Sequence, residues 1–198
     1  MADDSYRTIR APAEGYHTEK RSRFISYAIP VHTVEDAKAW IDKYRRQYYD
    51  ARHVCWAYML GAERVAFRAN DDGEPSSTAG KPILGQINSS ELTDILIVVV
   101  RYFGGIELGT GGLTVAYRTA AAAAIAAAQI EVRTVDTRIV IGFEYPFLNR
   151  VMRIVKDMQP KILSQTFDMD CEMTLSIRKN EADALIKRLL TVESVFLK

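Results

Sequence analysis

The chain has few of the residues that identify disulfide frameworks, zinc sites or strongly charged proteins. Its 198 residues include two cysteines, Cys55 and Cys171, and three histidines, and the cysteines have neither C-x-x-C nor Cys/His ligand spacing. We expect both cysteines to be small core residues in a reducing compartment. The formal net charge is +1, so contact with nucleic acid or a membrane would need a local patch.

Long apolar segments are also missing. The N-terminal sequence MADDSYRTIRAP has no apolar core of a signal peptide. The longest apolar stretch, TAAAAAIAAAQI, has too few residues and too few large side chains to span a bilayer. We therefore expect a cytoplasmic protein without membrane contact, whose length suits one large domain or two small ones.

Residues 1–136 alternate between strand and helix patterns. The expected strands cover residues 24–30, 53–60, 63–68 and 94–101, and the last is a β-branched run that suits a strand buried on both faces. A helix is expected over 34–49, with Thr33 as N-cap and Asp36 three residues later. The alanine-dense segment 113–128 predicts a second helix.

The polar segment 134–138 predicts a domain boundary, giving domains over 1–136 and 137–198. Strands are expected over 139–145, 161–167, 171–177 and 193–197, with a turn at 168–170. Helices are expected over 147–158 and 181–190, the second with Asn180 as N-cap. The βαββαβ order is the ferredoxin-like pattern, so the fold class predicted for the whole chain is α+β.

Eight of the eleven glycines lie between Gly73 and Gly112. The segment RYFGGIELGTGGLTVAY follows a buried strand and leads into a helix, where free backbone N–H groups and the helix dipole attract anions. This pattern indicates anion binding at Gly109, Thr110, Gly111 and Gly112. The alternative is that the glycines let the alanine-rich helix pack closely on the sheet, and the spacing fits neither nucleotide-binding glycine motif.

The segment DDGEPSSTAGKPIL combines acids, hydroxyls and a lysine. Asp71, Asp72 and Glu74 could chelate a divalent cation through oxygen ligands. The favoured alternative is a turn at Asp72-Gly73 with solvated acids. The hydroxyls and Lys81 could suggest a Ser/Lys hydrolase, but no fixed spacing supports one. We predict no catalytic residue and no metal ligand.

Two further positions could contact a ligand. His53 opens an aromatic-rich strand and could face Arg101 or the acids of the loop, although a lone histidine is more often structural. Tyr102 and Phe103 beside Arg101 could stack on an RNA base, or could pack under the glycine loop.

Three segments together resemble the IMPACT/YigZ family, also called uncharacterised protein family 0029. They are ARHVCWAY (51–58), DDGEPSSTAGKPIL (71–84) and VVVRYFGGIELGTGGLTVAY (98–117). The resemblance covers essentially the whole chain. It implies an N-terminal ribosomal protein S5 domain 2-like domain and a C-terminal ferredoxin-like domain similar to a C-terminal domain of elongation factor G.

The resemblance also implies a role in translation. Eukaryotic members of this family regulate translation by competing for the activator of a kinase, and bacterial members have no established enzymatic activity. We therefore expect a non-enzymatic binding protein without a cofactor, whose partner is RNA, the ribosome or a translation factor. The alternative is a magnesium-dependent enzyme that acts on a phosphorylated or nucleotide-like small molecule through Asp71, Asp72, Glu74 and Gly109–Gly112.

The predicted ligand-binding residues come from the three segments. They are His53, Asp71, Asp72, Glu74, Ser76, Thr78, Lys81, Arg101, Tyr102, Phe103, Gly104, Gly105, Gly109, Gly111, Gly112, Tyr117 and Arg118.

The chain departs from the common family pattern at three positions. Glu107 and Val115 stand where basic residues are usual, and Ser77 stands in place of a glycine. Each phosphate contact that is lost weakens nucleic-acid binding and its salt dependence.

Overall fold

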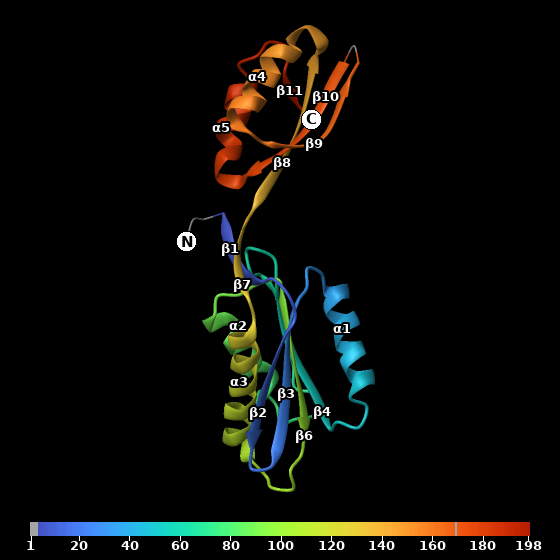
Figure 1. The fold of residues 1–198 in the computed structure, drawn as a ribbon, viewed down its shortest axis with the longest axis vertical. Coiled ribbons are helices and arrows are strands. Elements are labelled where there is room, and N and C mark those ends of the chain that lie inside the picture. The colour runs from blue at the N-terminus through green and yellow to red at the C-terminus, as the bar shows by residue number, and fades with distance from the viewer. Residues whose placement is uncertain (1–3, 169) are drawn as a thin grey trace. The chain divides into compact units, whose positions relative to one another are not determined.

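The computed structural model describes residues 4–168 and 170–198 and has an α+β architecture (Figure 1). The chain divides into two compact units. The first unit is Tyr6–Arg133, and the second is Thr134–Lys198 together with Asp4 and Ser5. The boundary expected from the sequence lies after residue 136, whereas this division lies after Arg133.

An antiparallel sheet with strand order β2-β3-β6-β4-β5 forms the centre of the first unit. Its strands are β2 (Ala13–Glu19), β3 (Ser22–Pro30), β6 (Ile95–Tyr102), β4 (His53–Leu60) and β5 (Ala66–Asn70). The central strand β6 is buried along its length except at its last residue. The β-branched run thus forms the doubly covered strand that its sequence predicts.

Helices cover both faces of this sheet (Figure 1). Helix α1 (Val34–Gln47) packs on one face against Leu96, Val98 and Val100. Helices α2 (Gly80–Ser89) and α3 (Gly109–Ala127) pack on the other face. Thr33 caps α1 as predicted, because its hydroxyl accepts from the backbone N–H of Asp36 while the Asp36 carboxylate accepts from the N–H of Thr33.

Several elements of the first unit differ from the sequence prediction. The sequence did not predict helix α2 or strand β2. It also did not predict the two-stranded sheet of β1 (Ser5–Ile9) and β7 (Ile130–Thr134). The predicted start of α3 at residue 113 was wrong, since the helix begins at Gly109. Glycine is a weak helix former, so the sequence pattern did not predict helix for residues 109–112.

The second unit contains the six predicted elements in βαββαβ order. They are β8 (Asp136–Glu144), α4 (Leu148–Met158), β9 (Lys161–Phe167), β10 (Asp170–Arg178), α5 (Lys179–Leu189) and β11 (Phe196–Leu197), with a short 3-10 turn at Tyr145–Phe147. The sheet order is β11-β8-β10-β9. The predicted turn at 168–170 includes Met169, which lies outside the described residues.

Asn180 is not the N-cap of α5, as the sequence had suggested, but lies inside the helix. A buried carboxylate from the start of the chain takes over the capping role. The backbone N–H of Asn180 donates to Asp4, and Arg178 donates two hydrogen bonds to the same carboxylate, at 2.6 and 2.8 Å. These hydrogen bonds, foremost those from Arg178, hold the pKa of Asp4 below its usual value.

Within the described residues, no helix is both long enough and apolar enough to cross a membrane.

Candidate anion-binding cleft

Two of the predicted acids stabilise the loop between β5 and α2. The Asp71 carboxylate accepts hydrogen bonds from the backbone N–H groups of Ser77, Ala79 and Gly80, at 2.8 to 3.0 Å. Since the N–H groups at a helix start have no intrahelical acceptor, Asp71 acts as a remote cap for α2. Asp72 accepts from the N–H of Val54 at 2.7 Å and from Arg45 at 2.8 Å.

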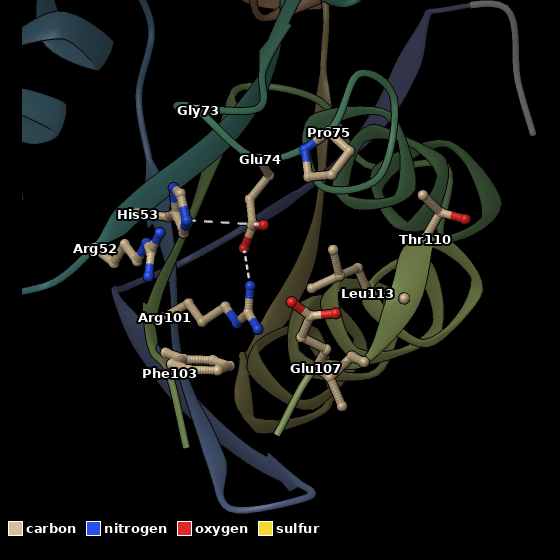
Figure 2. A pocket seen from close by; sticks show the side chains of 12 residues that line it. Arg52, His53, Gly73, Glu74, Pro75, Arg101, Phe103, Glu107, Thr110 and Leu113 are labelled. Atoms are coloured by element: carbon tan, nitrogen blue, oxygen red, sulfur yellow. Dashed lines mark hydrogen bonds and ion pairs between the residues drawn. The ribbon is translucent and has the colours of Figure 1, made fainter. Parts of the chain in front are cut away.

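The third acid, Glu74, lies at the centre of a buried network. Its side chain is 3% exposed, and its Oε1 accepts from Arg101 Nη1 at 2.6 Å and from the Tyr117 hydroxyl at 2.7 Å. Figure 2 shows Glu74 between Arg101 and His53, whose Nε2 is 3.8 Å from the second carboxylate oxygen. His53 Nδ1 donates to the Asp72 carbonyl at 2.7 Å, because a carbonyl oxygen can only accept.

Two potentially reactive groups complete this network and are held neutral. Cys55 Sγ lies 3.0 Å from the Asp71 carbonyl and 3.3 Å from the Tyr117 hydroxyl. Burial raises the pKa of the Cys55 thiol and that of the Tyr117 hydroxyl well above their ordinary values. A nucleophilic cysteine requires the opposite shift, so Cys55 has the properties of a structural thiol.

A cleft of about 480 Å³ opens beside this network (Figure 2). Its lining residues come from the start of β4, the β5–α2 loop, the end of β6 and the start of α3: Arg52, His53, Gly73, Glu74, Pro75, Arg101, Phe103, Glu107, Leu108, Gly109, Thr110 and Leu113. The register places His53 opposite Arg101, which explains how two distant motifs meet at this end of the sheet.

Arg101 contributes a guanidinium that is only partly satisfied. The residue is 6% exposed, and its Nε is buried without a hydrogen-bond acceptor anywhere in residues 4–168 and 170–198. Its guanidinium carbon lies 5.8 Å from the centre of the Phe103 ring. Burying a polar N–H without an acceptor is unfavourable, so this group has unused capacity to bind a ligand.

The first turn of α3 contributes further free donors. The residue at the N-cap position, Leu108, has no side-chain acceptor, and no side chain in the described part of the chain caps this helix. Gly109 has φ +69°, a conformation that favours glycine. Gly109 and Thr110 of this uncapped turn line the cleft, at the positive end of a 19-residue helix.

Two exposed charges border the cleft. The side chains of Arg52 and Glu107 make no ion pair or hydrogen bond with any other described residue. Figure 2 shows the Glu107 carboxylate turned toward the guanidinium of Arg101. The cleft thus presents two cations, Arg52 and Arg101, and the free carboxylate of Glu107. Glu74 partly neutralises the charge of Arg101.

The structure brings some predicted residues into the cleft. His53, Glu74, Arg101, Phe103 and Gly109 line it, and Gly111 and Gly112 belong to the same helical turn.

Other predicted residues have structural roles or lie elsewhere. Tyr117 and Asp71 belong to the buried network, and the Thr78 hydroxyl donates to the Pro75 carbonyl. Ser76 and Gly105 are exposed outside the lining of the cleft. Lys81 and Arg118 line a separate depression between α2 and α3.

Gly104 and Tyr102, two predicted ligand-binding residues, have other roles in the structure. A Cβ at Gly104 would lie 2.1 Å from the backbone carbon of Arg21, so this glycine serves close packing of the chain. Tyr102 does not join Arg101 and Phe103, because neighbouring residues of a strand point to opposite faces. Its hydroxyl donates to Asp50, and its ring lies 4.9 Å from the guanidinium of Arg23.

Arg52 was not among the residues predicted from the sequence. Neither was the apolar wall of the cleft, formed by Pro75, Leu108 and Leu113. Arg52 directly precedes His53, so its place at the same end of β4 was available from the sequence. The wall could not be found in this way, because its members come from separate segments and carry no motif.

The carboxylates do not form the magnesium site of the alternative hypothesis. Asp71, Asp72 and Glu74 bind different partners, and the described residues contain no cluster of three or more His, Cys, Asp or Glu side chains suited to a metal. The proposal of a magnesium-dependent enzyme on these three acids was therefore wrong in its geometry.

Comparison with known proteins identifies the family. Residues 20–125 match the model of the Impact N-terminal domain. An IMPACT family member from Haemophilus influenzae is 37% identical over 172 residues, which cover 86% of this chain and 84% of the relative. The IMPACT family member YigZ from Escherichia coli is 36% identical over 168 residues, covering 83% and 81%.

Solved structures agree with these relatives. One described as a hypothetical protein superposes with a TM-score of 0.75 at 32% identity, covering 98% of this chain and 96% of that chain. The chain belongs to the IMPACT family.

Proposed function

We propose that this protein is a non-enzymatic binding protein of the translation machinery that contacts RNA through the cleft. One observation carries the proposal: the buried, partly unsatisfied guanidinium of Arg101 and the uncapped start of α3 line the same cleft. Phosphate oxygens are the acceptors that suit both kinds of donor. The resemblance to translation regulators supplies the cellular setting.

The surroundings of Arg101 favour RNA over a simple anion. Phe103 is 44% exposed beside the guanidinium. Proteins that bind single-stranded RNA combine exposed aromatic rings with cations, because unstacked bases pack on the rings while phosphates meet the charges. Arg52 adds a free cation at the rim of the cleft.

The state of the reactive groups supports binding rather than catalysis. The Glu74 carboxylate is held by Arg101 and Tyr117, and burial keeps the Cys55 thiol and the Tyr117 hydroxyl protonated. A cysteine or tyrosine that acts as nucleophile or general base needs a lowered pKa. A glutamate that acts as general base needs a carboxylate that is free to contact the substrate.

We further propose that the two domains have the folds implied by the family. The strand order β11-β8-β10-β9 and the βαββαβ sequence of elements support a ferredoxin-like fold for residues 137–198. Separate hydrophobic cores support an independent domain over residues 1–136, for which the family implies the ribosomal protein S5 domain 2-like fold.

RNA titrations at several salt concentrations test the function. We compare the wild type with Arg52→Ala and use Lys81→Ala as the matched control, since Lys81 is an exposed cation outside the cleft. Arg52→Ala should weaken binding and lower the slope of log K against log salt by about 0.7, the value for one phosphate contact with a single strand. Lys81→Ala should bind as the wild type does.

Sucrose-gradient sedimentation of a lysate provides the second test. Co-migration with ribosomes that nuclease treatment abolishes supports the RNA proposal. Co-migration that survives nuclease, without binding of purified RNA, would indicate a translation factor as the partner. Absence of both ribosome co-migration and salt-sensitive RNA binding would refute the proposed function.

A further inference from the structure

The free carboxylate of Glu107 is not explained by phosphate binding. It lines the same cleft as Arg101 and Arg52, and it has no partner in the described part of the chain. A carboxylate repels phosphate, so at this place it opposes simple polyanion binding. Carboxylates do accept hydrogen bonds from the exocyclic amino groups of nucleobases.

We propose that the cleft is a single-nucleotide pocket that selects bases with an exocyclic amino group. The phosphate lies at the start of α3 beside Arg101 and Arg52, the base stacks on Phe103, and Glu107 accepts from its amino group. Adenine, cytosine and guanine have such a group, whereas uracil does not. This inference rests on the proposed function, in which the cleft is the contact with RNA.

The dimensions of the cleft agree with one nucleotide. Its volume of about 480 Å³ falls within the range of small-ligand sites. The residues Pro75, Leu108 and Leu113 form an apolar wall, and the last two are 9% and 6% exposed. A base or ribose can cover such a wall while the charged groups at the rim remain available to phosphate.

Gly111 provides independent support. Its φ is ordinary, and a Cβ added there would meet no described atom within 4 Å apart from its chain neighbours and the backbone of its own helix. Neither backbone conformation nor internal packing therefore requires glycine at this helical position, where it lowers stability. The missing side chain leaves the N–H groups of the first turn open to a phosphate. By contrast, a Cβ at Gly112 would lie 3.1 Å from Leu108 Cβ.

Titration with the four 5′-nucleoside monophosphates, followed by NMR, tests the role of Glu107. The wild type should bind the adenine, cytosine and guanine nucleotides at least about tenfold more tightly than the uracil nucleotide, as expected for one charge-assisted hydrogen bond. In Glu107→Gln, the cytosine and uracil nucleotides should bind within about twofold of each other, because an amide can donate as well as accept. Inorganic phosphate should bind Glu107→Gln at least as tightly as the wild type.

Gly111→Ala tests the phosphate end, with Gly85→Ala as matched control. Gly85 is a helical glycine on α2 whose added Cβ would likewise meet no described atom within 4 Å. Both variants should melt about 2 °C above the wild type, because alanine is the better helix former. Only Gly111→Ala should lower the affinity for nucleotides, by about tenfold.

The outcomes separate this inference from the proposed function. Equal affinities for the four nucleotides, or a preference that Glu107→Gln leaves unchanged, would overturn the single-nucleotide pocket. If RNA binding were then still weakened by Arg52→Ala, the proposed function would stand. Selective nucleotide binding without any RNA binding would contradict the proposed function and support the pocket.

Discussion

Replacing Glu74 with glutamine removes one buried charge from the first unit while keeping the shape of the side chain. The carboxylate is 3% exposed and its partner guanidinium 7% exposed, so solvent screens the pair little. Its Oε1 accepts from Arg101 at 2.6 Å and from Tyr117 at 2.7 Å. The glutamine oxygen can still accept, but it leaves Arg101 without a counter-charge.

The magnitude follows from these contacts. A hydrogen bond to a charged group contributes about 1.5–3 kcal/mol and a neutral one about 0.5–1.5 kcal/mol. Since Arg101 keeps its charge, only the Tyr117 bond becomes neutral, and it weakens by about 1–1.5 kcal/mol. Removing one member of a buried ion pair costs about 3–5 kcal/mol. We expect Glu74→Gln to lower the free energy of unfolding of the first unit by about 2–4 kcal/mol.

Tryptophan fluorescence in urea measures this change. Both tryptophans, Trp40 and Trp56, lie in the first unit, so the signal follows that unit alone. With a urea dependence of about 2 kcal/mol per M, the unfolding midpoint should fall by about 1–2 M. The control is Glu91→Gln, which removes an exposed acid 3.9 Å from Arg7 and should change stability by less than about 0.5 kcal/mol. A change for Glu74→Gln as small as that of the control would show that the Glu74 carboxylate does not stabilise the first unit.

Two other predictions concern buried ionisable groups. Because Arg178 lowers the pKa of Asp4, the stabilisation from this pair is complete above the usual pKa of about 3.9 and is lost as pH falls through the lower native pKa. Acid unfolding followed by NMR signals of the second unit should therefore be less pH-dependent in Asp4→Asn, and identical curves would contradict the assignment. Burial raises the pKa of both thiols, so a thiol reagent should label Cys55 and Cys171 rapidly only in denaturant. Rapid labelling of the native protein would contradict this.

Strong local patterns predicted the elements that the structure confirms. The continuous β-branched run became the buried strand β6, and Thr33 with Asp36 marked the start of α1. The elements that were missed have weak local signals. Helix α2 contains two glycines and a proline, and the strands β1 and β7 pair across most of the first unit's sequence. A local sequence pattern cannot predict pairing between segments that lie so far apart in the chain.

The sequence predicted the cleft only in part, because strand pairing between distant segments decides which residues meet there. His53, Arg101 and Gly109 stand in recognisable segments, but strand register decided that His53 and Arg101 would meet. Strand alternation decided that Tyr102 points away from them. The capping role of Asp71 depends on the path of its loop, so a reading of residue types alone could suggest a metal ligand instead.

An NMR titration with a single-stranded RNA oligonucleotide shows whether RNA binds in the cleft. We expect the largest changes on the backbone amides of Gly109, Thr110 and Gly111 and on the Nε–H of Arg101, which lacks an acceptor among the described residues. Raising the salt concentration should reverse these changes. RNA binding that leaves these four signals unmoved, with changes at Lys81 and Arg118 instead, would contradict binding in the cleft.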